Sequence, residues 1–341
     1  SRPMTVQIGY NASLADAVPL QTISEALGLA PASDDGPFRI HLGKGRYEEK
    51  ILVDKPRVRL LGSGKNNTTI SWADSGDSPG LDGQPDGPWG SYTVRVEAPD
   101  FGAHDLTIEN AFDYQANRML PDNDPNKVRN TQGVALMLAE GSDRALFDIV
   151  ALLGNQETLF VNAGRIYFRN VRLVGQVYFI FGAGQAVFEQ DNIELRNRPG
   201  KDPVAYVTAP STHIYQPYGM LFIDFRITRH DAGVPSGSVK LGRPWHPGAD
   251  PEVNGSAVFK NCFMDDSVSA DGYAPISSTA DGVRQWFDLE PDSRFFEYGS
   301  RGPGALGGPR RPQLDDYSAG YFTRANVLGN WIPMELKDLK K

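Results

Sequence analysis

Five polar side chains interrupt otherwise apolar sequence and could carry chemistry: Gln132, Gln156, Glu157, Tyr178 and Arg243. A carboxyl group and a phenol can each hold or release a proton, and a guanidinium binds carboxylates. Glu157 and Tyr178 are 21 residues apart, and Gln132 precedes Gln156 and Glu157 by 24 and 25 residues. These groups can act together only if the fold returns the chain to the same place about every 20 to 25 residues.

A repeat in the sequence predicts such a fold. Five segments share a phenylalanine at the matching position: Phe147, Phe168, Phe188, Phe222 and Phe259. The first three are 20 to 21 residues apart, and the wider spacings of 34 and 37 residues that follow indicate loop insertions. A period near 20 to 25 residues, with several short strands in each repeat, is typical of a β-solenoid. The leucine-rich repeat pattern is absent, and a propeller needs a longer period.

We therefore predict an all-β protein, a right-handed parallel β-helix. Successive rungs of such a fold lie about 4.8 Å apart. Glu157 and Tyr178 are then vertical neighbours on one face, with Gln132 on the rung before them. The stacked rungs form one elongated core, so we expect a single domain over residues 1–341.

Other segments fit this architecture. Thr22-Ile-Ser-Glu25 has capping-box spacing and predicts a short N-terminal helix, limited by Gly28 and Pro31, that covers the open end of the core. Insertions at 75–90, 116–130, 231–238 and 247–254 are expected to bulge from the rungs and shape a cleft. The tail from Phe295 to Lys341 is expected to pack along the outside of the solenoid.

Composition excludes several classes of function. The net charge of −8 argues against nucleic acid as a partner, and no stretch of about 18 apolar residues exists to span a membrane. A single cysteine, Cys262, excludes an intrachain disulfide and a cysteine-based zinc cluster, and it fits an inert core position. The five histidines lack metal-ligand spacing, so we predict neither a metal nor another cofactor. We expect a monomer, secreted or periplasmic, whose signal peptide has been removed.

Several short motifs resemble those of one enzyme family, the pectin methylesterases, in its bacterial form. In chain order they are Gly45-Arg-Tyr-Glu48, Asp105-Leu-Thr-Ile-Glu-Asn110, Thr131-Gln-Gly-Val-Ala-Leu136, Gly154-Asn-Gln-Glu-Thr-Leu159, Gly175-Gln-Val-Tyr-Phe-Ile-Phe-Gly182, Thr208-Ala-Pro-Ser-Thr212, Leu241-Gly-Arg-Pro-Trp245 and Asp292-Ser-Arg-Phe-Phe-Glu-Tyr298. The resemblance covers most of the chain and implies a pectin lyase-like solenoid. It implies a carbohydrate esterase that acts on pectin, an acidic polysaccharide, and modifies the cell wall.

The resemblance also implies roles for individual residues. Members of the family use two aspartates on adjacent rungs: one attacks the methyl ester carbonyl, and the other donates a proton to the leaving methanol and then activates water. Glutamines donate hydrogen bonds to the oxyanion, an arginine orients the nucleophile, and aromatic side chains bind sugar faces. The matching positions here are Gln132 and Gln156 for the oxyanion, Arg243 for the arginine, Glu157 for the acid/base, Tyr178 for the nucleophile, and Trp245, Phe160 and Arg243 for substrate binding.

The sequence departs from the family at both aspartate positions. Glu157 keeps a carboxyl group but is longer by one methylene, and a displacement of about 1 Å can lower a rate on the order of 100-fold. Tyr178 is a larger change, because a phenol with a pKa of about 10 is only about 0.1 % ionised at pH 7. A nearby Arg243 would favour the phenolate.

Three hypotheses follow. The first is a pectinesterase-like hydrolase of uronic-acid polysaccharide esters, with activity weakened or changed at Glu157 and Tyr178. The second is an inactive, uronan-binding homologue in which Tyr178 is a packing or sugar-stacking aromatic. The third is another ester or thioester hydrolase, or a β-eliminating enzyme with Tyr178 as the base. In purely structural interpretations, Glu157 is a hydrogen-bond partner, the glutamines form a polar ladder, Arg243 forms an ion pair, and Trp245 and Phe160 line the core.

Overall fold

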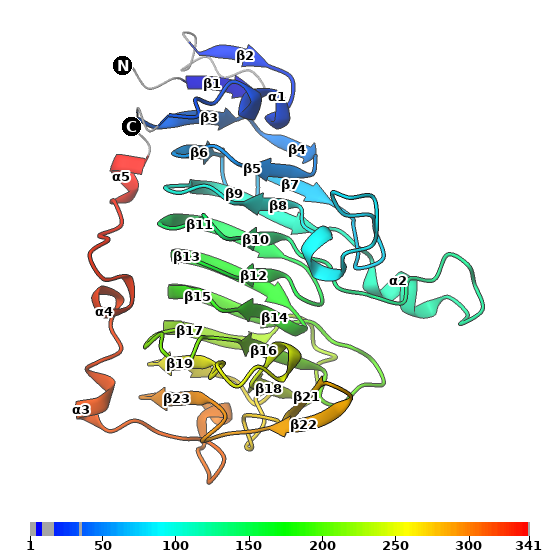
Figure 1. The fold of residues 1–341 in the computed structure, drawn as a ribbon, viewed down its shortest axis with the longest axis vertical. Helices are drawn as coiled ribbons and strands as arrows, with labels where there is room; N and C mark the ends of the chain where they lie inside the picture. The colour runs from blue at the N-terminus through cyan, green and yellow to red at the C-terminus, as the bar shows by residue number, and fades with distance from the viewer. Residues whose placement is uncertain (1–4, 9–16, 34–35, 340–341) are drawn as a thin grey trace.

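The chain folds into a parallel β-helix, as predicted. The structure, a computed structural model, describes residues 5–8, 17–33 and 36–339. Short segments with alternating apolar residues form the strands: β3 (Phe38–Leu42) buries Phe38, Ile40 and Leu42 and turns the residues between them outward. The strands stack as successive rungs along the long axis of the molecule (Figure 1).

Two long parallel sheets make up the rungs. The first, which we call sheet A, comprises β1 (Thr5–Ile8), β2 (Val18–Leu20), β3, β4 (Gly45–Glu48), β6 (Val58–Leu61), β7 (Thr68–Trp72), β9 (Gly102–Asn110), β11 (Ala145–Leu153), β13 (Arg165–Gly175), β15 (Gln185–Leu195), β17 (Met220–Arg229), β19 (Ser256–Lys260), β20 (Phe263–Met264) and β23 (Arg294–Tyr298). The second, sheet B, comprises β5 (Ile51–Val53), β8 (Val94–Val96), β10 (Leu136–Leu138), β12 (Leu159–Val161), β14 (Val177–Gly182), β16 (Ala205–Pro210) and β18 (Val239–Gly242).

The predicted repeat becomes a stack of phenylalanine rings inside the solenoid. Phe147, Phe168, Phe188, Phe222 and Phe259 are register partners on β11, β13, β15, β17 and β19. Consecutive ring centroids are 4.5–4.9 Å apart, with interplanar angles of 2–16°. Each ring is fully buried. The sequence period therefore corresponds to one turn of the β-helix.

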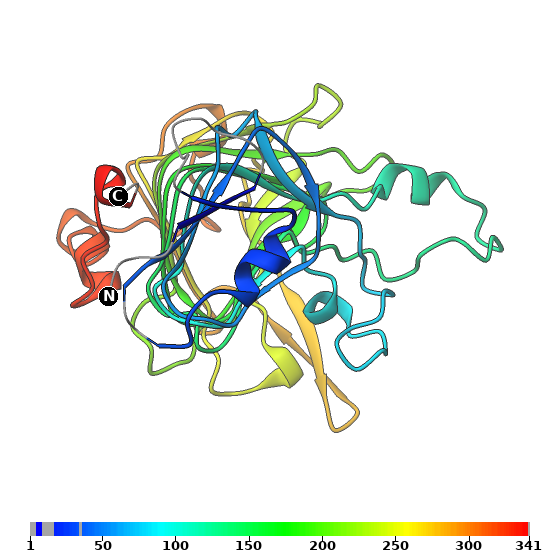
Figure 2. The same cartoon turned by 90° about the horizontal axis from the view of Figure 1, so that it is seen from above.

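The N-terminal end of the core is covered as predicted. Helix α1 (Ile23–Gly28) lies across it (Figure 2). In its capping box, the Glu25 backbone N–H donates to the Thr22 side chain, and the Thr22 backbone N–H donates to the Glu25 side chain. Ile23, Ala26 and Leu27 of this helix join the main apolar cluster of the interior.

The C-terminal tail packs along the outside, also as predicted. Its short helices, α3 (Asp316–Ala319), α4 (Arg324–Leu328) and α5 (Leu336–Leu339), run back along sheet A, so the tail returns to the N-terminal end (Figure 1). Val327, Leu328 and Leu339 pack there against the outward face of sheet A, in contact with Leu146 and Tyr167.

Long loops project from one side of the solenoid. The loop between β9 and β10 carries α2 (Tyr114–Met119), a helix that the sequence did not predict within its insertion. The loop between β7 and β8 carries the 3-10 helix η2 (Gly87–Gly90), and β21 (Ile276–Ala280) and β22 (Val283–Phe287) form an antiparallel hairpin. Figure 2 shows α2, η2 and the hairpin extending from this side. Two further 3-10 turns are η3 (Pro247–Ala249) and η4 (Pro303–Ala305). No helix in the described ranges is long and apolar enough to cross a membrane.

Candidate active site

Sheet B brings the predicted groups onto adjacent rungs. β12 and β14 pair Leu159 with Ile180, which places Glu157 and Tyr178 in the same register, and the Glu157 backbone N–H donates to the Val177 carbonyl at 3.0 Å. Gln132 lies on the rung before and forms a parallel bridge with Gln156, which is on the same rung as Glu157. The vertical arrangement expected from the repeat is confirmed.

The backbone at the two central positions is strained. Glu157 has φ +62° and Tyr178 has φ +45°, both in the left-handed region that L-amino acids other than asparagine and aspartate rarely occupy. The strain recurs one rung apart, so it is a property of this turn of the solenoid and not of one residue. Such backbone strain persists only where the surrounding structure enforces it, and it concentrates at functional sites.

Glu157 and Tyr178 face a small, enclosed and mainly aromatic pocket of about 180 Å³. Its lining residues are Pro88, Trp89, Glu157, Phe160, Tyr178, Phe181, Ala209, Trp245 and Ile276. We call it the aromatic pocket. A concave apolar site with a few convergent polar groups is the usual form of a small-molecule binding site.

The Glu157 carboxyl group is buried without a partner. Its Oε2 atom makes no hydrogen bond, and no basic side chain of the described ranges lies within ion-pairing distance of it. Burial raises its pKa to about 8. At neutral pH this group therefore carries its proton and can donate it to a leaving group.

The Tyr178 hydroxyl is held by Arg243. The arginine Nη1 donates to Tyr178 Oη at 2.5 Å, and the phenol ring stacks on Tyr206 with ring centroids 5.4 Å apart. Burial raises the pKa of Tyr178, and the opposing effect of the Arg243 charge does not cancel it. The neutral phenol is therefore the dominant form at neutral pH.

Arg243 is fully engaged within the protein. Its Nε and Nη2 atoms both donate to the Pro275 carbonyl, at 2.9 and 2.5 Å, and its guanidinium lies 4.8 Å from the centroid of the Tyr206 ring. These contacts fix its Nη1 on Tyr178. The arginine thus orients the Tyr178 hydroxyl.

The two glutamines are paired through their backbones across adjacent rungs, and neither is among the residues that line the aromatic pocket. The Thr131 hydroxyl donates to Gln156 Oε1 at 2.7 Å, which turns the NH2 end of that amide the other way. Gln132 Oε1 is buried without a hydrogen bond, and a Cβ atom on Gly76 would lie 2.1 Å from it. The absence of a side chain at Gly76 therefore makes room for Gln132.

The predicted substrate-binding aromatics form the wall of the aromatic pocket. Phe160 stacks on Phe181 at 4.1 Å, and Trp89 covers its edge at 4.9 Å, so the Phe160 ring has no exposed surface. Trp245 meets Phe181 edge-on at 5.9 Å and keeps part of its surface open. Phe160 thus supports the wall, and Trp245 and Trp89 present the open aromatic surface.

Several residues of the site were not predicted, and four of them shape or hold the predicted groups. Gly76 and Trp89 come from the insertion at 75–90, which the sequence marked only as a loop. Tyr206 and Pro275 hold Tyr178 and Arg243. Tyr206 lies 28 residues after Tyr178, close to one repeat, and this spacing is the signal that could have identified it.

No cluster of three or more histidine, cysteine, aspartate or glutamate side chains in the described part of the chain could hold a metal ion. Cys262 lies in the interior, where burial raises its thiol pKa to about 12. Its thiol is therefore protonated and unreactive.

Comparisons with known proteins place the chain in a family. The family model described as Pectinesterase matches residues 13–310. Pectinesterase A of Dickeya dadantii (strain 3937) is 39 % identical over 340 residues, which cover 95 % of this chain and 92 % of that protein.

Solved structures agree with this assignment. A crystal structure of a pectin methylesterase in complex with a hexasaccharide superposes with a TM-score of 0.92 at 37 % identity, covering 98 % of this chain and 100 % of that one. The pectin methylesterase from Yersinia enterocolitica gives a TM-score of 0.86 at 40 % identity, covering 92 % and 99 % of the two chains. The chain therefore belongs to the pectinesterase family of carboxylic ester hydrolases.

Proposed function

We propose that the chain hydrolyses methyl esters of a uronic-acid polysaccharide such as pectin in the aromatic pocket. Glu157 acts as the proton donor and acceptor, Tyr178 occupies the nucleophile position, and Gln132 and Gln156 stabilise the oxyanion. The observation that carries the proposal is the protonated, unpartnered Glu157 carboxyl, aligned with Tyr178 at the floor of an enclosed pocket. The hexasaccharide bound to a structurally similar pectin methylesterase is consistent with a carbohydrate substrate.

The proposed reaction has two steps. The Tyr178 phenolate attacks the ester carbonyl, and the oxyanion that forms accepts hydrogen bonds from the glutamine amides. As the intermediate collapses, the Glu157 carboxyl gives its proton to the departing methoxide, which leaves as methanol. Glu157 carboxylate then takes a proton from water, the resulting hydroxide attacks the aryl ester, and the phenolate departs. The uronic acid that is released gives its proton to the solvent and becomes the free uronate.

This mechanism predicts a particular pH profile. In the reactive form, Glu157 is protonated and Tyr178 is ionised. This form is the minor one, because Glu157, with a pKa of about 8, is the stronger acid of the two and loses its proton first. The fraction of that form rises about tenfold per pH unit up to about pH 8 and then stays level until the phenol itself titrates. Since the fraction is small even on the plateau, we expect slow turnover at neutral pH.

Methanol release from methyl-esterified pectin between pH 5 and pH 10 tests the proposal. We expect the parent protein to show the rise to about pH 8, and Tyr178→Phe to abolish release. Tyr178→Asp, which restores an acidic nucleophile, should release methanol faster than the parent at pH 6. Release that is unchanged in Tyr178→Phe would remove the tyrosine from the mechanism.

A second candidate function is uronan binding without turnover. It is favoured by the neutral state of Tyr178, whose hydroxyl is already occupied by Arg243. Under this alternative the parent protein binds methyl-esterified pectin and releases no methanol, and only Tyr178→Asp is active. The same experiment separates the two candidates.

We also infer that the protein works outside the cytoplasm, in the periplasm or after secretion, and as a monomer. A polysaccharide is too large to enter the cell, so the enzyme has to meet it outside. The residues that line the pocket all come from this chain, so catalysis would not require a residue from a partner subunit. Gel filtration and fractionation of producing cells test these two inferences.

A further inference from the structure

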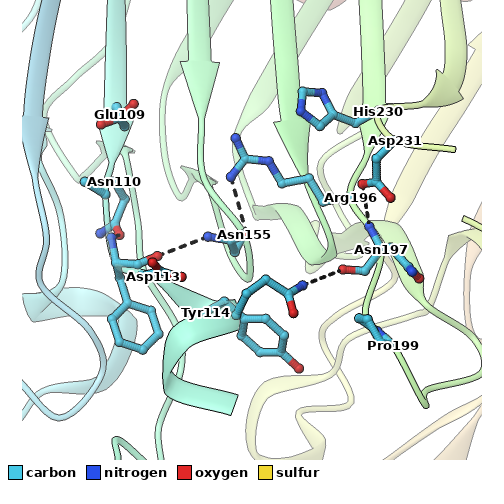
Figure 3. Close-up of a pocket in the computed structure, with 13 residues that line it drawn as sticks. Glu109, Asn110, Asp113, Tyr114, Asn155, Arg196, Asn197, Pro199, His230 and Asp231 are labelled. Atoms are coloured by element: carbon cyan, nitrogen blue, oxygen red, sulfur yellow. Dashed lines mark hydrogen bonds between the residues drawn. The ribbon is translucent and has the colours of Figure 1, made fainter. Parts of the chain in front are cut away.

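A second pocket, about 560 Å³ in volume, lies beside α2 and shares no residue with the aromatic pocket. It is formed where the sheet A strands end and the loop before α2 begins, and its polar residues come from several rungs (Figure 3). Its lining residues are Glu109, Asn110, Ala111, Phe112, Asp113, Tyr114, Gln115, Asn155, Arg196, Asn197, Pro199, His230 and Asp231. The volume is within the range of about 300–1,000 Å³ that is usual for ligand sites. We call it the α2 pocket.

Arg196 is the cation of this pocket, and no carboxylate neutralises it directly. In the described ranges its only side-chain contact is a long hydrogen bond of 3.4 Å from Nη1 to Asn155 Oδ1, and no carboxylate lies within ion-pairing distance. Burial lowers the pKa of Arg196, so its guanidinium has lost much of its water. Figure 3 shows the guanidinium in the space between Asn155 and His230. The charges of Glu109, Asp231 and Glu194 favour the guanidinium cation from a distance, but none of these carboxylates contacts it, so the positions for direct hydrogen bonds remain open to an anionic ligand.

The acidic residues of the α2 pocket, by contrast, have their own partners. Glu109 accepts from Arg46 at 2.7 Å, and Asp113 caps α2 by accepting from the Ala116 backbone N–H at 2.9 Å. Asp231 accepts from the Asn197 backbone N–H at 3.1 Å. A carboxylate oxygen has two acceptor sites, so these groups can still accept hydrogen bonds from hydroxyl groups.

We propose that the α2 pocket binds an unesterified uronate unit of a polysaccharide chain. The sugar carboxylate pairs with the Arg196 guanidinium, and the sugar hydroxyls donate to Asp231 and the other acceptors. The rings of Phe112 and Tyr114 supply an apolar surface for a sugar face. One cation, several acceptors and an aromatic surface match the groups of a sugar acid. The choice of a uronate rests on the proposed function, which supplies such units as its product.

The α2 pocket is close in sequence to the catalytic residues. Asn155, whose side chain contacts Arg196 and donates to the Phe112 carbonyl at 3.1 Å, directly precedes Gln156 and Glu157. The same turn of the backbone therefore contributes to both pockets. A uronan chain whose hydrolysed units occupy the α2 pocket would remain near the aromatic pocket.

Calorimetric titration with unesterified trigalacturonate tests the proposal, because it requires no turnover. We expect the parent protein to bind it, and Arg196→Gln to weaken that binding by about 10- to 100-fold, as loss of a charged hydrogen-bond partner does. Arg226→Gln is the matched control, since Arg226 is an exposed arginine on β17 outside the pocket. Tyr114→Ala should also weaken binding, and it keeps the test independent of how Arg196→Gln folds.

Three results would overturn the proposal: binding unchanged in both Arg196→Gln and Tyr114→Ala, equal binding of the fully methyl-esterified trimer in the α2 pocket, or displacement of the trimer by equimolar acetate. The last two would mean that a neutral sugar or a bare carboxylate is recognised instead. Trimer binding that depends on Arg196, in a protein that releases no methanol from pectin, would support the α2 pocket while contradicting the proposed hydrolysis.

Discussion

Glu157 and Glu194 both lie largely out of contact with water, yet their pKa values move in opposite directions. Burial raises the pKa of Glu157 to about 8. Burial acts in the same direction on Glu194, but hydrogen bonds and charge from His230 and Arg172 reverse it and lower the pKa to about 2. The Arg172 guanidinium meets Glu194 with two hydrogen bonds of 2.5 and 3.0 Å. The partners, more than the burial, decide the protonation state.

The two glutamates represent two regions with different tasks. On the outer face of sheet A, carboxylates are paired, as in Arg172–Glu194 and Arg169–Asp148, and they hold adjacent rungs together. In the aromatic pocket the Glu157 carboxyl group lies among aromatic rings, and its Oε2 atom has no hydrogen-bond partner. An unpaired buried carboxyl lowers the stability of the fold, and carboxyl groups whose pKa is raised in this way are typical of functional sites.

The strongest test of this comparison is Glu157→Gln. The amide keeps the shape of the side chain but cannot donate a proton to methoxide, so we expect methanol release to fall by about 10² to 10⁴-fold. Initial rates on methyl-esterified pectin at pH 8 measure it. Glu194→Gln is the matched control, because it makes the same chemical change outside the aromatic pocket, and its rate should stay near that of the parent.

Glu157→Gln, which should lower activity, should raise the stability of the fold at high pH. The folded-state pKa of Glu157 is raised, so its protonated form is favoured: the parent has full stability below about pH 4.5 and loses it as the pH rises through about 8. Glu157→Gln has no such loss. Its Tm should match the parent at pH 4 and exceed it by roughly 5 °C at pH 9. A lower Tm than the parent at pH 9 would contradict the unpaired, neutral state of Glu157.

Glu194→Gln provides the reverse case. Its folded-state pKa is lowered, so its contribution to stability is present above about pH 4.5 and disappears as the pH falls through about 2. The amide offers Arg172 and His230 one neutral oxygen in place of two charged ones, and we expect a loss of about 1–3 kcal/mol in the free energy of unfolding at pH 7. Urea denaturation at pH 7 and pH 2.5 measures it. An equal loss at both pH values would mean that packing, not charge, is responsible.

The sequence was informative where the repeat constrains the chain. The phenylalanine spacing fixed the rung period, and that period placed Glu157 beside Tyr178 and Gln132 on the rung before. The capping helix and the outer position of the tail followed from local patterns, and both are confirmed. Strand pairing in a β-helix is a repeated local event, which makes its register readable from spacing alone.

The sequence was uninformative where loops complete the site. Trp89 closes the aromatic pocket from an insertion whose path no repeat determines, and Pro275 fixes Arg243 from another. The protonation of Glu157 depends on this enclosure, so its pKa could not be predicted from its neighbours in the chain. The same holds for Arg196, whose lack of a carboxylate partner is visible only after folding.

Gly76→Ala tests how far such a loop controls the catalytic residues. A Cβ atom at this position would lie 2.1 Å from Gln132 Oε1, so the amide has to move away from the oxyanion. We expect kcat on methyl-esterified pectin to fall about tenfold with KM little changed, since the lost hydrogen bond forms mainly in the transition state. Gly83→Ala is the control in the same insertion, because a Cβ there meets nothing within 4 Å, although its φ of +80° adds backbone strain.

The variant Gln132→Ala should reproduce the kinetic effect of Gly76→Ala, and combining the two substitutions should lower kcat little further. If the two effects multiplied instead, Gly76 would act on something other than Gln132, and the contrast between a paired, rigid sheet A and a loop-dependent aromatic pocket would need another explanation.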